Sequence, residues 1–143
     1  MDRQGCGGVR AAGGGPQVIV AFTGGRNYSN RAMVEFVVDV LCSYEDLGSP
    51  AVGLEIRVGD CPTGLDAIVS SIDQATAKVY RADWSKHGKA AGPIRNGNML
   101  RGGEVLNIRD TADLLIAFKG GAGTADCVRQ ARELGIPVLE CPA

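Results

Sequence analysis

One pattern constrains the fold of this chain more than any other: an apolar run of strand length ends in a glycine-containing loop, and a helical pattern follows the loop. Apolar runs with this sequel span residues 18–22 and 112–118, and the strand predicted at 54–58 ends in a glycine loop and is followed by a helical pattern in the same way. Further strands are predicted at 77–82 and 136–140, and helices at 30–44, 65–74, 94–105 and 124–134. Strands that alternate with helices form mainly parallel sheets. We therefore predict an α/β fold, a three-layer Rossmann-like arrangement with a mainly parallel sheet flanked by helices.

The length of the chain, 143 residues, suits one compact domain. Residues 1–15 contain six glycines and few large apolar side chains. Such a segment cannot bury enough apolar surface to offset the entropy of ordering it. We therefore expect a disordered tail over residues 1–16 and a single domain over residues 17–143.

Charge and hydropathy restrict the partners and the location of the protein. The net charge of −1 argues against a protein whose main activity is binding nucleic acid. No apolar run approaches the roughly 20 residues of a membrane span, and the first residues lack the apolar core of a signal peptide, so we expect a cytoplasmic protein. The cysteines lack the CxxC spacing of zinc sites, and we expect neither a metal nor a cofactor.

The glycine loops should meet at one place, because ligands bind beyond the carboxyl ends of parallel strands, which share one edge of the sheet. The first loop supplies a hydroxyl, flexible backbone and a guanidinium suited to a phosphate or carboxylate. The second carries a carboxylate just inside a helix, where it either complements the helix dipole or contacts a ribose or a base. The residues are Thr23, Gly24, Gly25 and Arg26 in the first loop and Gly59, Gly64 and Asp66 in the second.

The last glycine loop is the most informative stretch, because its three glycines and a threonine exceed what a turn requires. Glycine lets a backbone approach a ligand, and a helix start offers unpaired N–H groups and the positive end of a dipole. We expect Gly120, Gly121, Gly123 and Thr124 to bind a phosphate or a carboxylate. Thr124 caps the helix, contacts the anion or does both, while Asp126 in the first turn complements the dipole or contacts the ligand.

A polar segment, which we expect to be irregular, spans residues 83–92 before the helix predicted from residue 94. It holds the only tryptophan, Trp84, whose context favours a packing anchor over a platform for a base. Beside a bound nucleotide, Trp84 either closes over the base or only supports the loop. Arg95 and Asn96 follow Pro93 at the predicted opening turn of the helix. Polar side chains beside free N–H donors make a second anion contact plausible there.

Read together, these residues resemble the YspA- and YpsA-related branch of the SLOG superfamily, over roughly residues 18–138. The markers are Thr23-Gly24-Gly25-Arg26, Gly59-x-x-x-x-Gly64-x-Asp66, Ala82-Asp83-Trp84, Gly88-Lys89-Ala90-Ala91-Gly92-Pro93-Ile94-Arg95-Asn96, Met99, and Ala117-Phe118 with Gly120 to Asp126. The resemblance implies a Rossmann-like fold and a site for a nucleotide-derived ligand.

The chain is also similar, more distantly, to the lonely guy family of cytokinin-nucleotide phosphoribohydrolases, which cleave the N-glycosidic bond of a nucleoside monophosphate. Gly120-Gly121-Ala122-Gly123-Thr124 matches the glycine–threonine core of one family motif, and Arg95 and Met99 match a second. Three positions depart from these motifs: Lys119 replaces a proline, Asn96 a lysine and Cys127 a glutamate. Asp126 is one residue early, which turns its side chain by about 100° on a helix. This resemblance implies phosphate binding more than hydrolysis.

Three functions follow from these patterns. The leading one is binding of a nucleotide or nucleotide-derived phosphoribosyl ligand, for example as a sensor. The phosphate would bind at residues 121–124, with Arg26 and Arg95 around its oxygens. Asp66 and Asn96 would contact the ribose. The first alternative is a phosphoribohydrolase or N-glycosidase with Asp126 and Arg95 as catalytic residues.

The second alternative is a nucleic-acid-associated protein, because the DNA-processing protein A family shares the superfamily fold. The cations available for such an edge are Arg26, Arg31, Lys86, Lys89, Arg95 and Arg101. The acidic balance of the chain makes nucleic acid an unexpected partner. We also expect a homo-oligomer, since relatives self-associate and the helices at 30–44 and 94–106 have apolar faces.

Overall fold

The computed structural model describes residues 17–47, 53–72 and 76–142, so the tail predicted over residues 1–16 lies outside the described residues. The described strands form one parallel sheet in the order β3-β2-β1-β4-β5. They are β1 (Gln17–Thr23), β2 (Gly53–Gly59), β3 (Ala77–Tyr80), β4 (Leu114–Ala117) and β5 (Val138–Glu140). The strands predicted from the sequence are confirmed, with small shifts at their ends.

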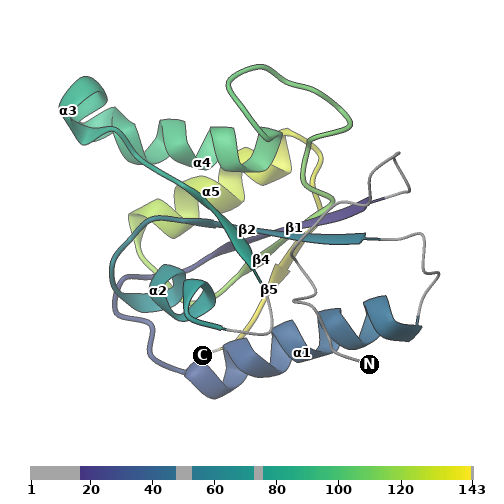
Figure 1. Ribbon diagram of the computed structural model, residues 1–143. Helices are drawn as coiled ribbons and strands as arrows, with labels where there is room; N and C mark the ends of the chain where they lie inside the picture. The colour runs from purple at the N-terminus through teal and green to yellow at the C-terminus, as the bar shows by residue number, and fades with distance from the viewer. Residues whose placement is uncertain (1–16, 48–52, 73–75, 143) are drawn as a thin grey trace.

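Helices cover both faces of the sheet (Figure 1). One face is covered by α1 (Arg31–Leu47) and α2 (Gly64–Ser70), and the other by α4 (Ala91–Arg101) and α5 (Ala122–Glu133). Two short elements, α3 (Trp84–His87) and the 3₁₀-helix η1 (Gly88–Ala90), lead into α4. The predicted three-layer Rossmann-like fold is confirmed.

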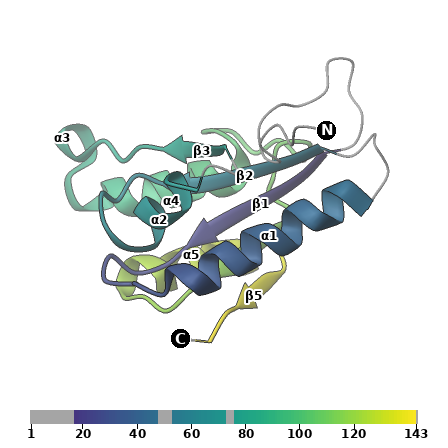
Figure 2. The same ribbon diagram turned by 60° about the horizontal axis from the view of Figure 1, so that its bottom comes forward.

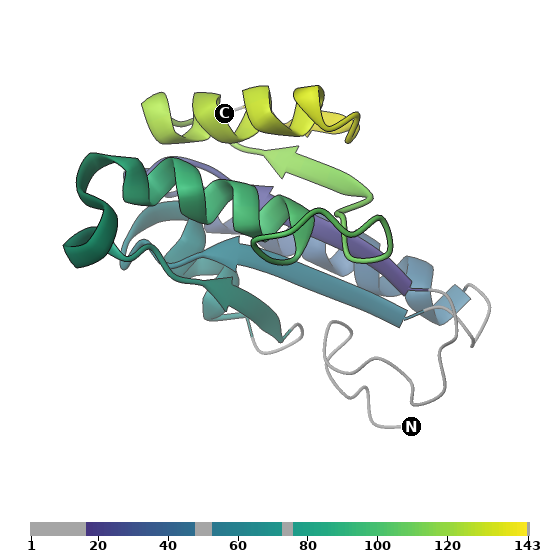
Figure 3. The same ribbon diagram turned by 90° about the horizontal axis from the view of Figure 1, so that it is seen from above.

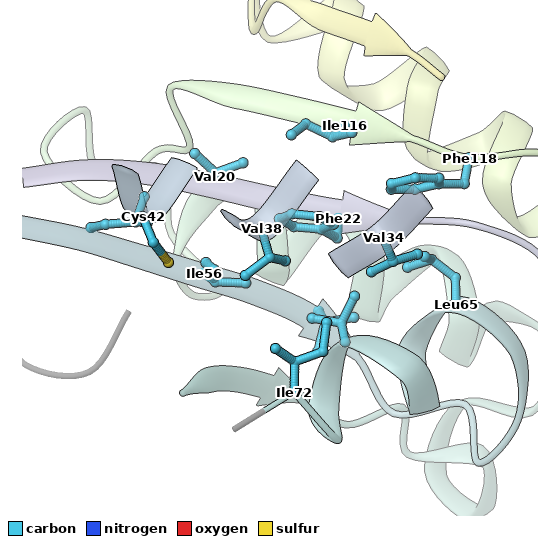
Figure 4. Packing of buried hydrophobic residues seen from close by; sticks show 13 residues of the cluster. Val20, Phe22, Val34, Val38, Cys42, Ile56, Leu65, Ile72, Ile116 and Phe118 are labelled. Carbon is cyan, nitrogen blue, oxygen red and sulfur yellow. The ribbon is translucent and has the colours of Figure 1, made fainter. Parts of the chain in front are cut away.

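The central strand, β1, is buried on both faces. Val20 and Phe22 pack with α1 in the apolar cluster shown in Figure 4, whereas Ile19 and Ala21 belong to the cluster beneath α4 and α5. Successive side chains of a strand point to opposite faces, so a strand covered on both sides reads as an unbroken apolar run. α1 runs alongside β1 (Figure 2), and the side chains that it buries there recur every four residues, at Val34, Val38 and Cys42 (Figure 4).

The strand order reverses at β1. The chain passes from β1 outward to β2 and β3, and then returns to the other side of β1 at β4. In open parallel sheets such a reversal leaves a crevice beyond the carboxyl ends of the two strands at the switch. Here the loops after β1 and β4 flank it, and they are two of the three loops that the sequence analysis expected to converge.

Several predicted helix boundaries are wrong. α4 begins at Ala91 rather than 94, because Pro93 is tolerated in a first turn, where its missing N–H has no partner to lose. It ends at residue 101 instead of 105, since Gly102 adopts a left-handed conformation, with φ +86°, and its N–H donates to the carbonyl of Asn98. The segment 83–92, expected to be irregular, is mostly helical. α2 ends at residue 70 instead of 74, and α5 begins at 122 instead of 124.

The loop after α4 is held by a buried arginine of β2. Arg57 is 2% exposed, and its Nη1 donates to the carbonyl oxygens of Met99, at 3.0 Å, and Asp110, at 2.6 Å. Its Nε pairs with Glu55. Charge-assisted hydrogen bonds of this kind satisfy a guanidinium that burial would otherwise penalise. Arg57 thereby fixes the end of α4 and the following loop against the sheet.

The apolar helix faces on which self-association was predicted are packed against the sheet and form part of the core. Val34 and Val38 of α1 pack on one face of the sheet, and Met99 and Leu100 of α4 on the other. Self-association stays a prediction, but those two faces no longer support it. No helix in the described parts of the chain is long and apolar enough to cross a membrane.

Candidate functional site

A cleft of about 1300 Å³ opens at the carboxyl edge of the sheet. The loops after β1, β2 and β4 meet there with α3 and the first half of α4. Almost every residue predicted to bind a ligand lines the cleft: Thr23, Gly24, Gly25, Arg26, Gly59, Asp66, Trp84, Arg95, Asn96, Gly120, Gly121, Gly123 and Thr124. Gly64 and Asp126 do not belong to this lining. The convergence expected from the strand–loop pattern is therefore present.

The loops after β1 and β4 are joined backbone to backbone. The N–H of Gly25 donates to the carbonyl of Lys119 at 3.0 Å. A Cβ on Gly25 would lie 2.9 Å from the Cα of Gly120, and one on Gly120 would lie 2.1 Å from Oγ1 of Thr124. No side chain fits at such distances, so these two glycines are required by the close approach of the loops.

Gly64 has a structural role rather than a ligand contact. Its φ is +72°, and an added Cβ would lie 2.2 Å from the carbonyl oxygen of Gly25. That same oxygen accepts the N–H of Leu65 at 3.1 Å, and Oγ1 of Thr63 donates to the carbonyl of Arg26 at 2.9 Å. The start of α2 is thus clasped to the first glycine loop, which keeps that loop in place beside the cleft.

The start of α5 is the part of the cleft best suited to an anion. α5 begins at Ala122, no side chain caps it, and no acidic residue lies in its first turn. Gly121 and Gly123 have no positive φ, and an added Cβ at either would meet nothing within 4 Å. The presence of glycine at these two positions is therefore explained neither by a left-handed backbone conformation nor by close packing. A helix start with free N–H groups and no side chains in the way is a ready site for a phosphate.

The helix boundary changes two predicted roles. Because α5 starts at 122, Thr124 is its third residue and does not cap it. Its Oγ1 lies beside Gly120 at the cleft, where contact with an anion is still available to it. Asp126 is the fifth residue of the helix, beyond the first turn in which it was expected.

Two cations stand free at the mouth of the cleft. Arg26 follows β1 and Lys119 follows β4, and both side chains are exposed and line the cleft. Among the residues that the structure describes, neither forms an ion pair. Lys119 entered the sequence analysis only as a departure from a family motif. Its position next to a glycine loop that follows a buried strand was the signal that could have identified it.

The guanidinium of Arg95 has partners within the protein that were not predicted. It is the fifth residue of α4, not part of the opening turn, and its Nη1 pairs with Oδ1 of Asp60 at 2.7 Å. Its Nε donates to Oδ1 of Asn96 at 3.0 Å. Sequence reasoning missed Asp60, although it directly follows the second strand. Asp60 neutralises the arginine that was expected to clamp a phosphate.

Asp66 lies in the floor of the cleft and is 8% exposed. Its Oδ2 accepts the N–H of Cys61 at 3.1 Å, which folds the loop after β2 over the helix start. Burial raises the pKa of this carboxyl above its usual range, and the hydrogen bond from Cys61 and the positive charge of Arg95 offset part of the rise. Asp66 therefore supports the loop and faces the cleft at once.

Asn96 and Asp126 connect α4 to α5. Asn96 is 4% exposed, and its Nδ2 donates to the carbonyl of Gly123 at 3.2 Å and to Oδ2 of Asp126 at 3.1 Å. Gln130 and Arg129 also donate to the Asp126 carboxylate, each at 2.7 Å. Partial burial opposes ionisation of Asp126, but these hydrogen bonds outweigh it and lower its pKa.

Asp126 does not line the cleft, so the geometry does not favour the catalytic role predicted for it, and that role stays a prediction. Its carboxylate is engaged between the two helices, outside the cleft lining. Its contacts hold Asn96 against the carbonyl of Gly123 and so position the start of α5. The amide of Asn96 is likewise used within the protein, although the residue borders the cleft.

Cys127 is fully buried. Burial raises the pKa of its thiol to about 12, and a hydrogen bond from Thr23 offsets only part of the effect. A nucleophilic cysteine needs its thiolate. Cys127 is therefore a packing residue at neutral pH.

We expect iodoacetamide at pH 8 to leave Cys127 unmodified in the folded protein while it alkylates the half-buried Cys61. The reason is that Cys127 is both inaccessible and protonated at that pH. Peptide mass spectrometry after a timed reaction measures both sites in one sample. Alkylation of Cys127 at a rate close to that of Cys61 would contradict this description.

Trp84 is exposed, so the expectation of a packing anchor is wrong. It begins α3, is 59% exposed and lines the cleft. Its Cη2 lies 3.5 Å from the position of a Cβ built on Gly92, so the indole rests over the start of α4.

Tyr28 borders the same cleft and packs against Phe118, with 5.2 Å between ring centroids. Its hydroxyl is buried without a hydrogen-bond partner among the described residues. The sequence analysis assigned it no role, since nothing in the local pattern distinguishes a packed tyrosine from an exposed one.

The basic edge required for nucleic acid is partly neutralised. Arg31 pairs with Glu35 and Arg95 with Asp60, whereas Arg101 donates a hydrogen bond to the uncharged Asn98. Within the described residues, no group of three or more histidine, cysteine, aspartate and glutamate side chains is placed to hold a metal ion.

Comparison with known proteins gives one partial match. The chain is similar to the Gene 61 protein of Mycobacterium phage D29, with 44% identity over 66 residues. The match covers 45% of this chain and 46% of that protein, so the chain spans about half the length of this relative. No family model matches the chain. No solved structure matches it either.

Proposed function

We propose that this protein binds a nucleotide, or a nucleotide-derived phosphoribosyl ligand, in the cleft at the carboxyl edge of its sheet. The observation that carries the proposal is the uncapped start of α5, where Gly121 and Gly123 are required by neither backbone conformation nor packing. Their open surroundings are what a phosphate needs in order to reach the N–H groups of residues 122–124.

The charges around the helix start support an anionic ligand. Arg26 and Lys119 come from the two strands at the switch point and leave their side chains free to move onto a phosphate. Arg95 is held by Asp60 and serves mainly to balance the acidic floor of the cleft. The proposed phosphate contacts are therefore backbone N–H groups and two exposed cations.

The rest of the cleft suits a sugar and a base. Asp66 supplies a carboxylate on the cleft floor for a ribose hydroxyl, and Trp84 supplies an exposed aromatic ring. The volume of about 1300 Å³ leaves ample room for a whole nucleotide. Binding is the activity that these contacts support, and a protein that binds such a ligand without cleaving it would act as a sensor.

Removal of either free cation tests the proposal. We expect Lys119→Ala and Arg26→Ala each to weaken the binding of adenosine 5′-monophosphate about tenfold, because each removes a charge-assisted contact to phosphate. Isothermal titration calorimetry measures the dissociation constant. Arg109→Ala is the matched control, since Arg109 is an exposed cation outside the cleft.

The proposal predicts an unchanged dissociation constant for the control. Equal affinity in all four proteins would show that the nucleotide binds elsewhere. A further test uses adenosine, guanosine, cytidine and uridine 5′-monophosphates. The proposal would be overturned if none of them gave heat on titration and none raised the melting temperature at millimolar concentration.

A further inference from the structure

The segment that carries Trp84 projects from the body of the domain. Figures 1 and 3 show α3 at the far end of α4, away from α1. No residue of α3 or η1 is buried. The two ends of the segment are nevertheless fixed: the N–H of Ala82 donates to Oδ2 of Asp60 at 3.2 Å, and Ala91, the first residue of α4, is 1% exposed. We call residues 83–90 the arm.

The arm has a defined shape although it adds nothing to the core. Asp83 caps α3, since its Oδ1 accepts the N–H of Lys86 at 3.1 Å and the hydroxyl of Ser85 at 2.8 Å. Gly88 bends the chain between α3 and η1 with φ +56° and ψ −133°, a conformation open essentially to glycine alone. A Cβ there would meet nothing within 4 Å, so this glycine serves the bend and not the packing.

The shape of the arm sets the position of one aromatic ring. Trp84 is the only tryptophan of the chain and lines the cleft with more than half of its surface exposed. Indole is among the largest apolar side chains, and leaving it in water forgoes the stabilisation that its burial would give. The ring rests over Gly92, which adds no side chain between it and α4. Three features therefore hold the flat face of the indole at the cleft. They are the cap at Asp83, the bend at Gly88 and the lack of a side chain at Gly92.

The arm and the polar floor of the cleft share one carboxylate. Asp60 accepts from the N–H of Ala82 through Oδ2 and from Arg95 through Oδ1. The root of the arm is thus tied to a residue that faces the cleft. This contact fixes the root of the arm at the cleft, which the start of α5 also lines.

We propose that the arm is the subsite for the aromatic base of the ligand, with Trp84 stacking on it. This inference rests on the proposed function, because it assumes that the phosphate of the same ligand binds at the start of α5. It adds that the ligand must carry a flat heterocycle and that a bare sugar phosphate is a poor ligand. Stacking tolerates different bases, since every base has a π-face, so the arm selects for the presence of a base rather than for its identity.

The test compares two ligands that differ only by the base. Adenosine 5′-monophosphate and ribose 5-phosphate are titrated calorimetrically against the unaltered protein, Trp84→Ala and Trp84→Phe. Stacking on one aromatic side chain changes affinity by a factor of about 5 to 150. We expect Trp84→Ala to weaken nucleotide binding by a factor within that range and to change the affinity for ribose 5-phosphate by less than twofold. Trp84→Phe should recover part of the lost nucleotide affinity.

A second readout uses the indole itself. Because Trp84 is the only tryptophan, its fluorescence reports this position alone. Adenosine 5′-monophosphate should quench it and ribose 5-phosphate should not. Gly88→Ala, which disturbs the bend without touching the cleft lining, should weaken nucleotide binding and spare ribose 5-phosphate.

The outcomes separate the two proposals. Equal affinity of the unaltered protein for both ligands, or an equal loss for both in Trp84→Ala, would overturn the stacking subsite and leave phosphate binding intact. Binding of neither ligand would overturn the proposed function and the subsite with it. Because Trp84 is exposed, the variants should remain folded, which circular dichroism checks.

Discussion

Gly64→Ala is expected to lower the free energy of unfolding by about 2–5 kcal/mol. A left-handed conformation costs an L-residue about 1–2 kcal/mol, and forcing an atom into a filled space adds about 1–3 kcal/mol. Both costs apply, because Gly64 has φ +72° and its missing Cβ would lie 2.2 Å from the carbonyl oxygen of Gly25. The clasp between α2 and the first glycine loop has to open before the methyl group fits.

Denaturant unfolding measures the loss, and Gly135→Ala provides the matched control. Gly135 has a similar φ of +77°, but a Cβ there would meet nothing within 4 Å. The control should therefore lose only the backbone cost of about 1–2 kcal/mol. Equal losses in the two variants would mean that the close contact with Gly25 does not contribute to the stability of the fold.

Gly123→Leu is expected to weaken nucleotide binding about 100-fold and to leave the fold intact. A leucine side chain would occupy the space over the start of α5 and keep a phosphate away from its N–H groups. Two lost charge-assisted hydrogen bonds account for a loss of this size. The fold should not suffer, since an added Cβ meets nothing within 4 Å and leucine favours a helix over glycine by about 0.5–1 kcal/mol.

Two measurements on the same protein separate these effects. Calorimetric titration with adenosine 5′-monophosphate gives the affinity, and urea unfolding gives the stability. Gly103→Leu is the control, because Gly103 also has open surroundings but lies outside the cleft. Unchanged affinity in Gly123→Leu would exclude the start of α5 as the phosphate site, whereas a loss of stability would mean that the glycine there is structural.

Much of the fold could be predicted because its signals are local. An unbroken apolar run such as residues 18–22 indicates a strand covered on both faces, and the four-residue recurrence at Val34, Val38 and Cys42 indicates a helix on a sheet. The convergence of the glycine loops follows from parallel topology alone. For that reason the lining of the cleft was largely predictable before its geometry was known.

Helix boundaries were less predictable, because neighbouring structure decides them. Pro93 was interpreted as preceding a helix start at residue 94, but the helical arm before it lets α4 begin at Ala91, three residues earlier. That shift takes Arg95 away from the first turn. A similar shift in α5 takes Asp126 away from its first turn and leaves it bonded between helices. A side chain's direction changes by about 100° per helical residue, so errors of one or two residues reassign its role.

The separate roles of the glycines could not be predicted at all. In the sequence, Gly64, Gly120, Gly121 and Gly123 look equivalent, yet the first two are required by contacts with Gly25 and Thr124. Only the structure shows that Gly121 and Gly123 face open space. The pairing of Arg95 with Asp60 is a contact between residues 35 positions apart, and no local pattern encodes it.

The most direct test of the central claim is to locate the phosphate by nuclear magnetic resonance. Amide spectra of the ¹⁵N-labelled protein are recorded during titration with adenosine 5′-monophosphate. We expect the largest amide shifts at Ala122, Gly123 and Thr124, because their N–H groups form the uncapped start of α5. Largest shifts on another surface, such as the groove around Arg132 and Glu140, or no shifts at millimolar nucleotide, would contradict the account.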